Sequence, residues 1–248
     1  MGVPAGTRTV WRAALDRRLE SGALRVITPH TRPLLLKSTG VSLRSIDFWL
    51  RDRVADGALI PLQRGFYINT LAAPRVDLNE VACRLRPGAI ISLASALLSV
   101  SASDSEMREP GSATYVVIPI RRGAPPPSLG VIDTVLGPLH IHGIPERILG
   151  AGALLDRLEP GHAYQRATPE RALVDWLYLS RTRRSTVAPP PVLEAFCAQG
   201  LDFDRLHRLG RAAEIGPLVD DYLEVQASST SASREVINAS KMSGLSRL

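Results

Sequence analysis

Cationic and hydroxyl side chains share one side of a helix that the sequence predicts from about residue 43. Counted at about 100° per residue, that side carries Arg44, Ser45, Phe48, Arg51 and Asp52. Arginine can form paired hydrogen bonds with the edge of guanine in the major groove, and serine can reach a base or a phosphate. This pattern therefore predicts a helix that reads DNA.

The residues around this helix predict a winged helix-turn-helix. A buried stripe is expected on the opposite side of the helix, formed by Leu43, Ile46, Leu50 and Val54. Thr39-Gly40 supplies a tight turn after a preceding helix, and Ser42 can cap the free amides of the new helix. Gly57 tolerates the positive φ that ends a helix.

A hairpin is expected next, and it would form the wing. Two apolar runs, residues 58–62 and 66–68, flank Gln63-Arg64-Gly65, which fits a turn that contains glycine. Arg64 at the tip is expected to meet the neighbouring phosphates or the minor groove. The candidate DNA-binding residues are Ser42, Arg44, Ser45, Phe48, Arg51, Gln63 and Arg64. The alternative is a protein-interaction module whose exposed arginines are simply solvated.

The charge distribution favours DNA. The chain of 248 residues carries a formal net charge of +6. Residues 1–75 hold 12 basic and 5 acidic side chains, a net charge of +7, and residues 76–248 hold 18 basic and 19 acidic, a net charge of −1. A positive field confined to the segment with the helix-turn-helix attracts a polyanion and speeds its capture.

The whole pattern predicts an α+β protein, in which the winged helix-turn-helix precedes a mixed α/β domain. We place the DNA-binding domain at residues 1–75, a C-terminal domain at 76–227 and a flexible tail at 228–248. Residues 10–21 are expected to form a helix whose inward side holds Val10, Ala14, Leu15 and Leu19. A short strand at residues 23–28 can pair with the wing.

The C-terminal domain is expected to alternate helices and strands. Residues 77–85 predict a helix, 89–100 a strand that enters a helix near Ser92, and 114–120 a strand. Residues 131–144 resemble a hairpin with Gly137-Pro138 at its turn. Thr168-Pro169 is a typical helix start, because the hydroxyl caps the helix and proline suits its first position. Short helices are expected at 189–200, 203–214 and 217–226.

No catalytic constellation is found in the sequence, and we expect no cofactor, no bound metal and no enzymatic activity. The phosphate-loop and nucleophile-elbow motifs are both missing. His140 and His142 lie on one face of a predicted strand, a spacing that can hold a metal, but neither a cysteine nor a third histidine is near. This pair leaves open an alternative, in which the C-terminal domain is a nuclease or a metal- or ligand-responsive module.

The sequence is that expected of a cytoplasmic protein. Cys83 and Cys197 lie in apolar helical contexts without metal spacing, which indicates reduced core residues. The N-terminus shows no apolar signal region, and no run approaches the roughly 18 apolar residues of a membrane span. We expect no membrane partner.

Three motifs in order resemble the AbiEi family of antitoxins and predicted transcriptional regulators. They are Gln63-Arg64-Gly65-Phe66-Tyr67, the segment at residues 91–97 (ISLASAL), and the segment at residues 167–175 (ATPERALVD). The resemblance covers residues 10–225 and implies a type IV toxin-antitoxin system. It implies an N-terminal winged helix that represses its own operon at operator DNA, for which we expect inverted repeats.

The resemblance also implies a function for the C-terminal domain. That domain would be an antitoxin domain, which opposes a nucleotidyltransferase toxin of the AbiEii type. The motif residues carried over to it are Pro169, Glu170, Arg171 and Asp175. Their chemistry also allows a purely structural role, with Glu170 and Arg171 as first-turn and ion-pair residues and Asp175 bonded to a neighbouring helix.

Overall fold

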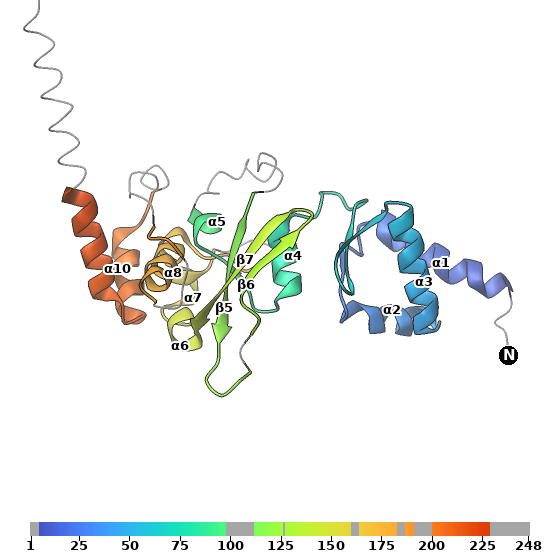
Figure 1. Ribbon diagram of the computed structural model, residues 1–248, viewed down its shortest axis with the longest axis horizontal. Helices are drawn as coiled ribbons and strands as arrows, with labels where there is room; N and C mark the ends of the chain where they lie inside the picture. The colour runs from blue at the N-terminus through green and yellow to red at the C-terminus, as the bar shows by residue number, and fades with distance from the viewer. Residues whose placement is uncertain are drawn as a thin grey trace, which may run out of the picture. The chain divides into compact units, whose positions relative to one another are not determined.

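The computed structural model describes residues 5–97, 112–125, 127–159, 164–182, 187–190 and 200–228 of the chain (Figure 1). The chain is a mixture of helices and strands and divides into two compact units. The first unit comprises Met1–Ala89, Glu109–Thr114 and Gly130–His140, and the second comprises Ile90–Arg108, Tyr115–Leu129 and Ile141–Leu248. The domain boundary placed after residue 75 stays a prediction.

The first unit begins with three helices and a small antiparallel sheet. The helices are α1 (Ala5–Glu20), α2 (Thr31–Thr39) and α3 (Leu43–Ala55). The strands are β1 (Val26–Ile27), β2 (Leu59–Gln63) and β3 (Phe66–Asn69), in the order β1-β3-β2. β1 and β2 both pair antiparallel with β3, so the helices and strands expected between residues 10 and 69 are present.

The core of these elements differs from the predicted stripes at two positions. Leu43 is half exposed and Val10 is two-thirds exposed, whereas Trp49 and Trp11 are buried. Leu43 is the first residue of α3 and lies outside the core, whereas Trp49, six residues later, lies in the core. The indole nitrogen of Trp49 donates a hydrogen bond to Asp16 Oδ1 of α1 at 2.9 Å, which satisfies its polar atom.

Side-chain hydrogen bonds join the loops of the first unit. The Asn69 side chain is buried and donates to the carbonyls of Leu19 and Leu24 at 2.8 and 2.9 Å. Arg25 Nε lies 3.0 Å from both carboxylate oxygens of Glu80, and Nη1 donates to the Pro74 carbonyl at 2.9 Å. The Glu80 carboxylate raises the pKa of Arg25. These bonds hold α4 (Leu78–Leu85) against the strand that precedes α2.

A second sheet has the strand order β4-β5-β7-β6. Its strands are β4 (Ile90–Ile91), β5 (Thr114–Ile120), β6 (Gly130–Thr134) and β7 (Gly137–Pro145). The turn between β6 and β7 is formed by Val135 and Leu136, not by Gly137-Pro138 as predicted. The Thr134 hydroxyl closes this turn, since it accepts from the Leu136 amide at 3.1 Å and donates to the Gly137 carbonyl at 2.7 Å.

The described residues of the second unit include several helices. They are α5 (Ala94–Leu97), α6 (Glu146–Leu149), α7 (Leu154–Arg157), α8 (Pro169–Arg181), α10 (Phe203–Ala212) and a helical stretch at residues 216–228. α8 packs against α5, α7 and α10 and supplies much of the apolar core (Figure 1). Thr168 caps α8 and Pro169 is its first residue, as predicted.

Some predicted segments cannot be compared with the structure. Most of the helix expected at 189–200, which includes Cys197, and the tail after residue 228 lie outside them. Among the helices described, none combines the length and the apolar character that a membrane crossing requires.

Candidate nucleic-acid interface

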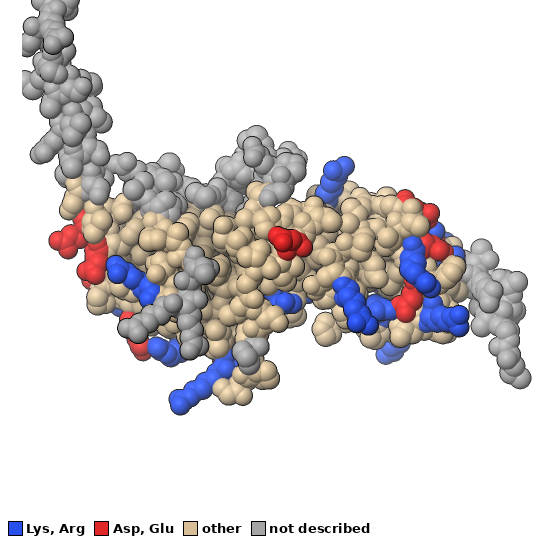
Figure 2. All heavy atoms as spheres, viewed as in Figure 1, with Lys and Arg blue, Asp and Glu red and all other residues tan. Residues whose placement is uncertain are grey.

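Three side chains of α3 form an exposed stripe. Arg44, Phe48 and Arg51 are exposed and follow one another at intervals of four and three residues, about one helical turn each. The opposite side of α3 is buried by Ile46, Trp49 and Leu50. Lys and Arg side chains gather over the region of α2 and α3 (Figure 2). The core therefore holds α3 so that this stripe, which we call the α3 stripe, faces solvent.

The acidic residues of α3 are occupied by cations of other helices. Asp52 forms an ion pair with Arg12 of α1 at 3.0 Å, and Asp47 forms an ion pair with Arg32 of α2. Within the described ranges, neither Arg44 nor Arg51 has an acidic partner. Because these carboxylates are already neutralised, the α3 stripe keeps an uncompensated positive charge.

Phe48 lies in the centre of the α3 stripe with two guanidinium groups over its ring. Arg12 Cζ lies 5.3 Å from the ring centroid, and Arg51 Cζ lies 5.6 Å from it. Both distances are within the range of a cation–π interaction. Arg12 also lies over the Trp11 ring, at 5.5 Å. The ring of Phe48 is therefore positioned by α1 as well as by its own helix.

The two serines at the start of α3 mainly organise the helix N-terminus. Ser42 Oγ accepts from the Ser45 amide at 3.2 Å, and the two hydroxyls are 3.0 Å apart. The predicted cap is confirmed. The Ser42 side chain faces solvent and the Ser45 side chain is half-buried. Each hydroxyl can still exchange a hydrogen bond with a base or a phosphate.

The hairpin between β2 and β3 presents the other two candidates. Gln63 pairs with Phe66 and is half-buried, whereas Arg64 is exposed in the turn. Gly65 adopts a φ of +81°, and a Cβ atom there would lie 3.2 Å from Pro29 Cγ. The glycine thus allows a tight turn with Arg64 at its tip, and no acidic partner for Arg64 is found in the described part of the chain.

The late motif residues of the second unit lie inside the fold. The side chains of Arg171 and Asp175 are 1% and 0% exposed and form an ion pair within α8. Arg171 Nη1 donates to the Ile148 carbonyl at 2.9 Å, and the Ser92 hydroxyl donates to Asp175 Oδ2 at 2.8 Å. The pair therefore joins α8 to the end of α6 and to the segment before α5.

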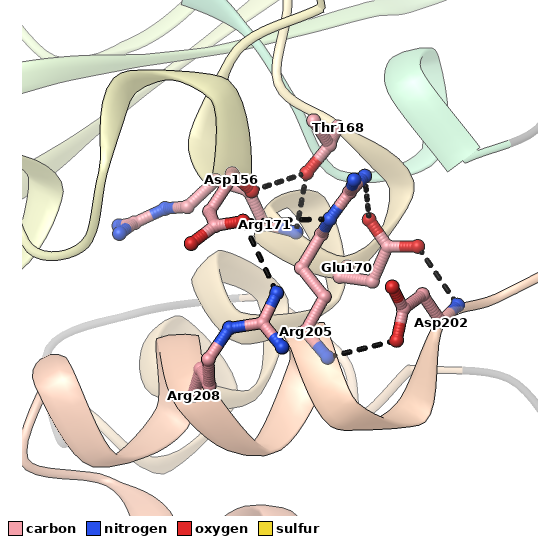
Figure 3. A network of polar contacts seen from close by, with 7 residues as sticks. All are labelled: Asp156, Thr168, Glu170, Arg171, Asp202, Arg205 and Arg208. Atoms are coloured by element: carbon pink, nitrogen blue, oxygen red, sulfur yellow. Dashed lines mark hydrogen bonds and ion pairs between the residues drawn. The ribbon is translucent and has the colours of Figure 1, made fainter.

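Glu170 connects α8 to α10 (Figure 3). Its side chain is 3% exposed; it accepts from the Asp202 amide at 3.0 Å and lies 3.5 Å from Arg205 Nη1. Asp202 in turn caps α10 by accepting from the Arg205 amide at 2.9 Å. The Thr168 hydroxyl donates to the Asp156 carbonyl at 2.9 Å. As folded, the motif residues Glu170, Arg171 and Asp175 hold α8 in place.

The histidine pair of β7 lies in a mixed environment. His140 and His142 are both half-buried, and the His142 ring stacks on Tyr115 with the centroids 6.3 Å apart. Nowhere in the described ranges do three or more His, Cys, Asp or Glu side chains come close enough together to hold a metal ion. The structure therefore adds no further ligand to the pair within those ranges.

The chain shows limited similarity to known proteins. No protein-family model and no curated protein matches the chain. Among solved structures, the chain is similar to the RV2827C protein from Mycobacterium tuberculosis, with 17% sequence identity and a TM-score of 0.48, over 88% of this chain and 80% of that chain. The candidate interface therefore rests on the geometry of its own residues.

Arg12 is the residue of this surface that the sequence pattern did not identify. It belongs to α1, outside the predicted DNA-reading helix, and it lies against Phe48 and Asp52 of α3. A periodicity within one helix carries no signal for such a contact. The only sequence hint is that Asp47 and Asp52 interrupt the basic side of α3 and require cations from elsewhere.

Proposed function

We propose that the first unit is a winged helix-turn-helix that binds double-stranded DNA and inserts α3 into the major groove. The observation that carries this proposal is the α3 stripe, where Arg44 and Arg51 are exposed and have no acidic partner among the described residues. Arg44 and Arg51 would contact base edges. Arg64 at the hairpin tip would contact phosphate.

The electrostatics of the unit support the same partner. Residues 1–75 carry a net charge of +7, while the rest of the chain is close to neutral. Each phosphate that a cation neutralises releases counterions, so the logarithm of the affinity falls with that of the salt concentration, by about 0.9 per phosphate. A protein that used this surface for a neutral partner would not show that dependence.

The second part of the proposal is biological. The protein is an antitoxin that represses its own toxin-antitoxin operon and opposes a nucleotidyltransferase toxin of the AbiEii type. This step is supported by the resemblance of the three motifs to the AbiEi family. Since Glu170, Arg171 and Asp175 are buried, they would maintain the antitoxin domain, and any direct contact with the toxin would use other residues.

Binding to DNA is tested with the full-length chain. We would measure its affinity for the DNA upstream of its own gene, and for a shuffled duplex of equal length, over a series of salt concentrations. We expect a preference for the upstream DNA and a steep loss of affinity with salt. Arg211→Ala serves as a matched control for Arg44→Ala, because it removes the same charge from an exposed position of α10. Equal binding to both duplexes would contradict the proposal.

The antitoxin role has a separate test. The chain is co-expressed with any nucleotidyltransferase encoded next to it, and growth is compared with expression of that enzyme alone. Rescue of growth supports the role, and continued arrest with a folded antitoxin present contradicts it. DNA binding without rescue would leave a repressor that is not an antitoxin.

A further inference from the structure

The half-exposed ring of Phe48 contributes less apolar burial to the fold than its neighbours in α3. The side chain is 50% exposed, although its neighbours Ile46, Trp49 and Leu50 are fully buried in the same helix. Burial of an aromatic ring stabilises a fold, whereas a ring left in water contributes little. What distinguishes Phe48 from other exposed apolar residues is its place in the centre of the α3 stripe, among cations that would face a bound partner.

The surroundings of the ring indicate the chemistry of that partner. Two guanidinium groups, from Arg12 and Arg51, lie over the ring, and Arg44 is one turn away on the same exposed side. A partner must therefore offer an apolar group close to several negative charges. The major groove of DNA has this combination, since the C5-methyl group of thymine projects into it between the two phosphate backbones.

We propose that Phe48 contacts the C5-methyl group of a thymine in the operator. This inference rests on the proposed binding of DNA through α3 and adds the identity of one base. Along the axis of a helix, four residues span about 6 Å, which is close to two base-pair steps of about 3.4 Å. The thymine would therefore lie within about two base pairs of the guanine read by Arg44.

Arg12 acts as a positioning residue in this arrangement. Arg12 is itself held by the ion pair with Asp52, so its guanidinium lies over the ring before DNA arrives. A ring fixed in this way loses little side-chain freedom on binding.

The experiment removes the methyl group and nothing else. The binding site is first selected from a randomised duplex pool with the full-length protein. Each thymine of the selected site is then replaced by deoxyuridine, one position at a time, and the affinity is measured for the parent, Phe48→Ala and Phe48→Leu. At one position of the bound site we expect the parent to lose about fourfold in affinity, the factor that burial of one methyl-sized group supplies.

The variants assign that loss to the ring. Phe48→Ala is expected to bind the thymine and uracil duplexes equally, and Phe48→Leu to retain part of the difference. Measurement at low salt keeps the binding of Phe48→Ala in range through its phosphate contacts. Leu154→Ala is the matched control, because Leu154 is a similarly exposed apolar residue of the second unit; it should behave like the parent. Circular dichroism melting confirms that each variant is folded.

The outcomes separate this inference from the proposed function. A specific site at which no uracil substitution weakens binding would overturn the thymine contact and leave DNA recognition standing. The same conclusion follows if Phe48→Ala still discriminates uracil from thymine, or if the ring proves to be needed only for a protein partner. Failure to select any site from the pool would overturn DNA recognition itself, and the thymine contact with it.

Discussion

Asp175→Asn is expected to lower the free energy of unfolding of the second unit by about 3–5 kcal/mol. The side chains of Asp175 and Arg171 are 0% and 1% exposed. The carboxylate accepts hydrogen bonds from both Arg171 and Ser92, in each case with a donor 2.8 Å away. Asparagine preserves the shape and one acceptor oxygen but removes the negative charge, so the buried guanidinium would face neutral acceptors, the amide oxygen and the carbonyl of Ile148.

The size of this loss in unfolding free energy depends on the burial of the pair, and it can be compared with the effect of breaking an exposed ion pair. The side chains of Arg121 and Glu146 are 67% and 53% exposed and lie 3.0 Å apart. Exposed pairs of this kind contribute about 0–1 kcal/mol, so Arg121→Met should change stability by no more than that. A domain is stable by about 5–15 kcal/mol in total, and Asp175→Asn would therefore remove a large fraction of the stability.

The assay is urea denaturation combined with amide hydrogen exchange over α8, which reports on the second unit alone. Replacing both charged residues, Arg171→Met with Asp175→Leu, should cost much less than the sum of the single changes, because no unpaired charge remains. The reasoning is refuted if Asp175→Asn costs no more than Arg121→Met. A stable Asp175→Asn variant that fails to neutralise the toxin would contradict a purely structural role for Asp175.

Three further predictions concern the interface, the core of the first unit and one helix cap. Arg44→Ala should weaken operator binding by about 1–3 kcal/mol and relax the preference for one base pair. Arg64→Ala should weaken binding to all DNA sequences equally and reduce the slope of log affinity against log salt by about one. Parent-like binding by both variants would show that α3 does not read DNA. Leu50→Ala should destabilise the first unit by about 2–5 kcal/mol, measured by thermal unfolding. The hydrogen bond from the Arg205 amide lowers the pKa of Asp202. This cap should therefore stabilise the fold at pH values above the ordinary aspartate pKa and lose that effect as the pH falls through the lowered pKa. Asp202→Asn should make the free energy of unfolding depend less on pH in this range.

The limits of many elements were predictable, because local interactions determine them. Ser42 caps α3 and Thr168 caps α8 with hydrogen bonds to amides three residues away. Gly57 ends α3 with a φ of +74°, and Gly65 allows the hairpin turn. Such signals lie within a few consecutive residues, so the sequence alone carries them. The exposed positions of Arg44 and Arg51 followed in the same way from helical periodicity.

Whether an apolar side chain of a helix is buried depends on the element that packs against it, and the sequence of the helix does not reveal that packing. Leu43 and Trp49 were both available to α3, and only the packing of α1 over the later turns decided that Trp49 enters the core. Periodicity identifies the side of a helix but not how far along it the neighbouring elements reach. The apolar Leu43 is therefore exposed although it belongs to the predicted stripe.

The contacts that give the two candidate regions their chemistry join residues far apart in the chain. Arg12 meets Phe48 and Asp52, and Ser92 meets Asp175, because helices separated in sequence pack together. Sequence spacing established that a cationic helix and a capped motif helix exist. Only the tertiary structure decided which charges are neutralised and which remain for a partner, since that depends on distances between elements that no periodicity encodes.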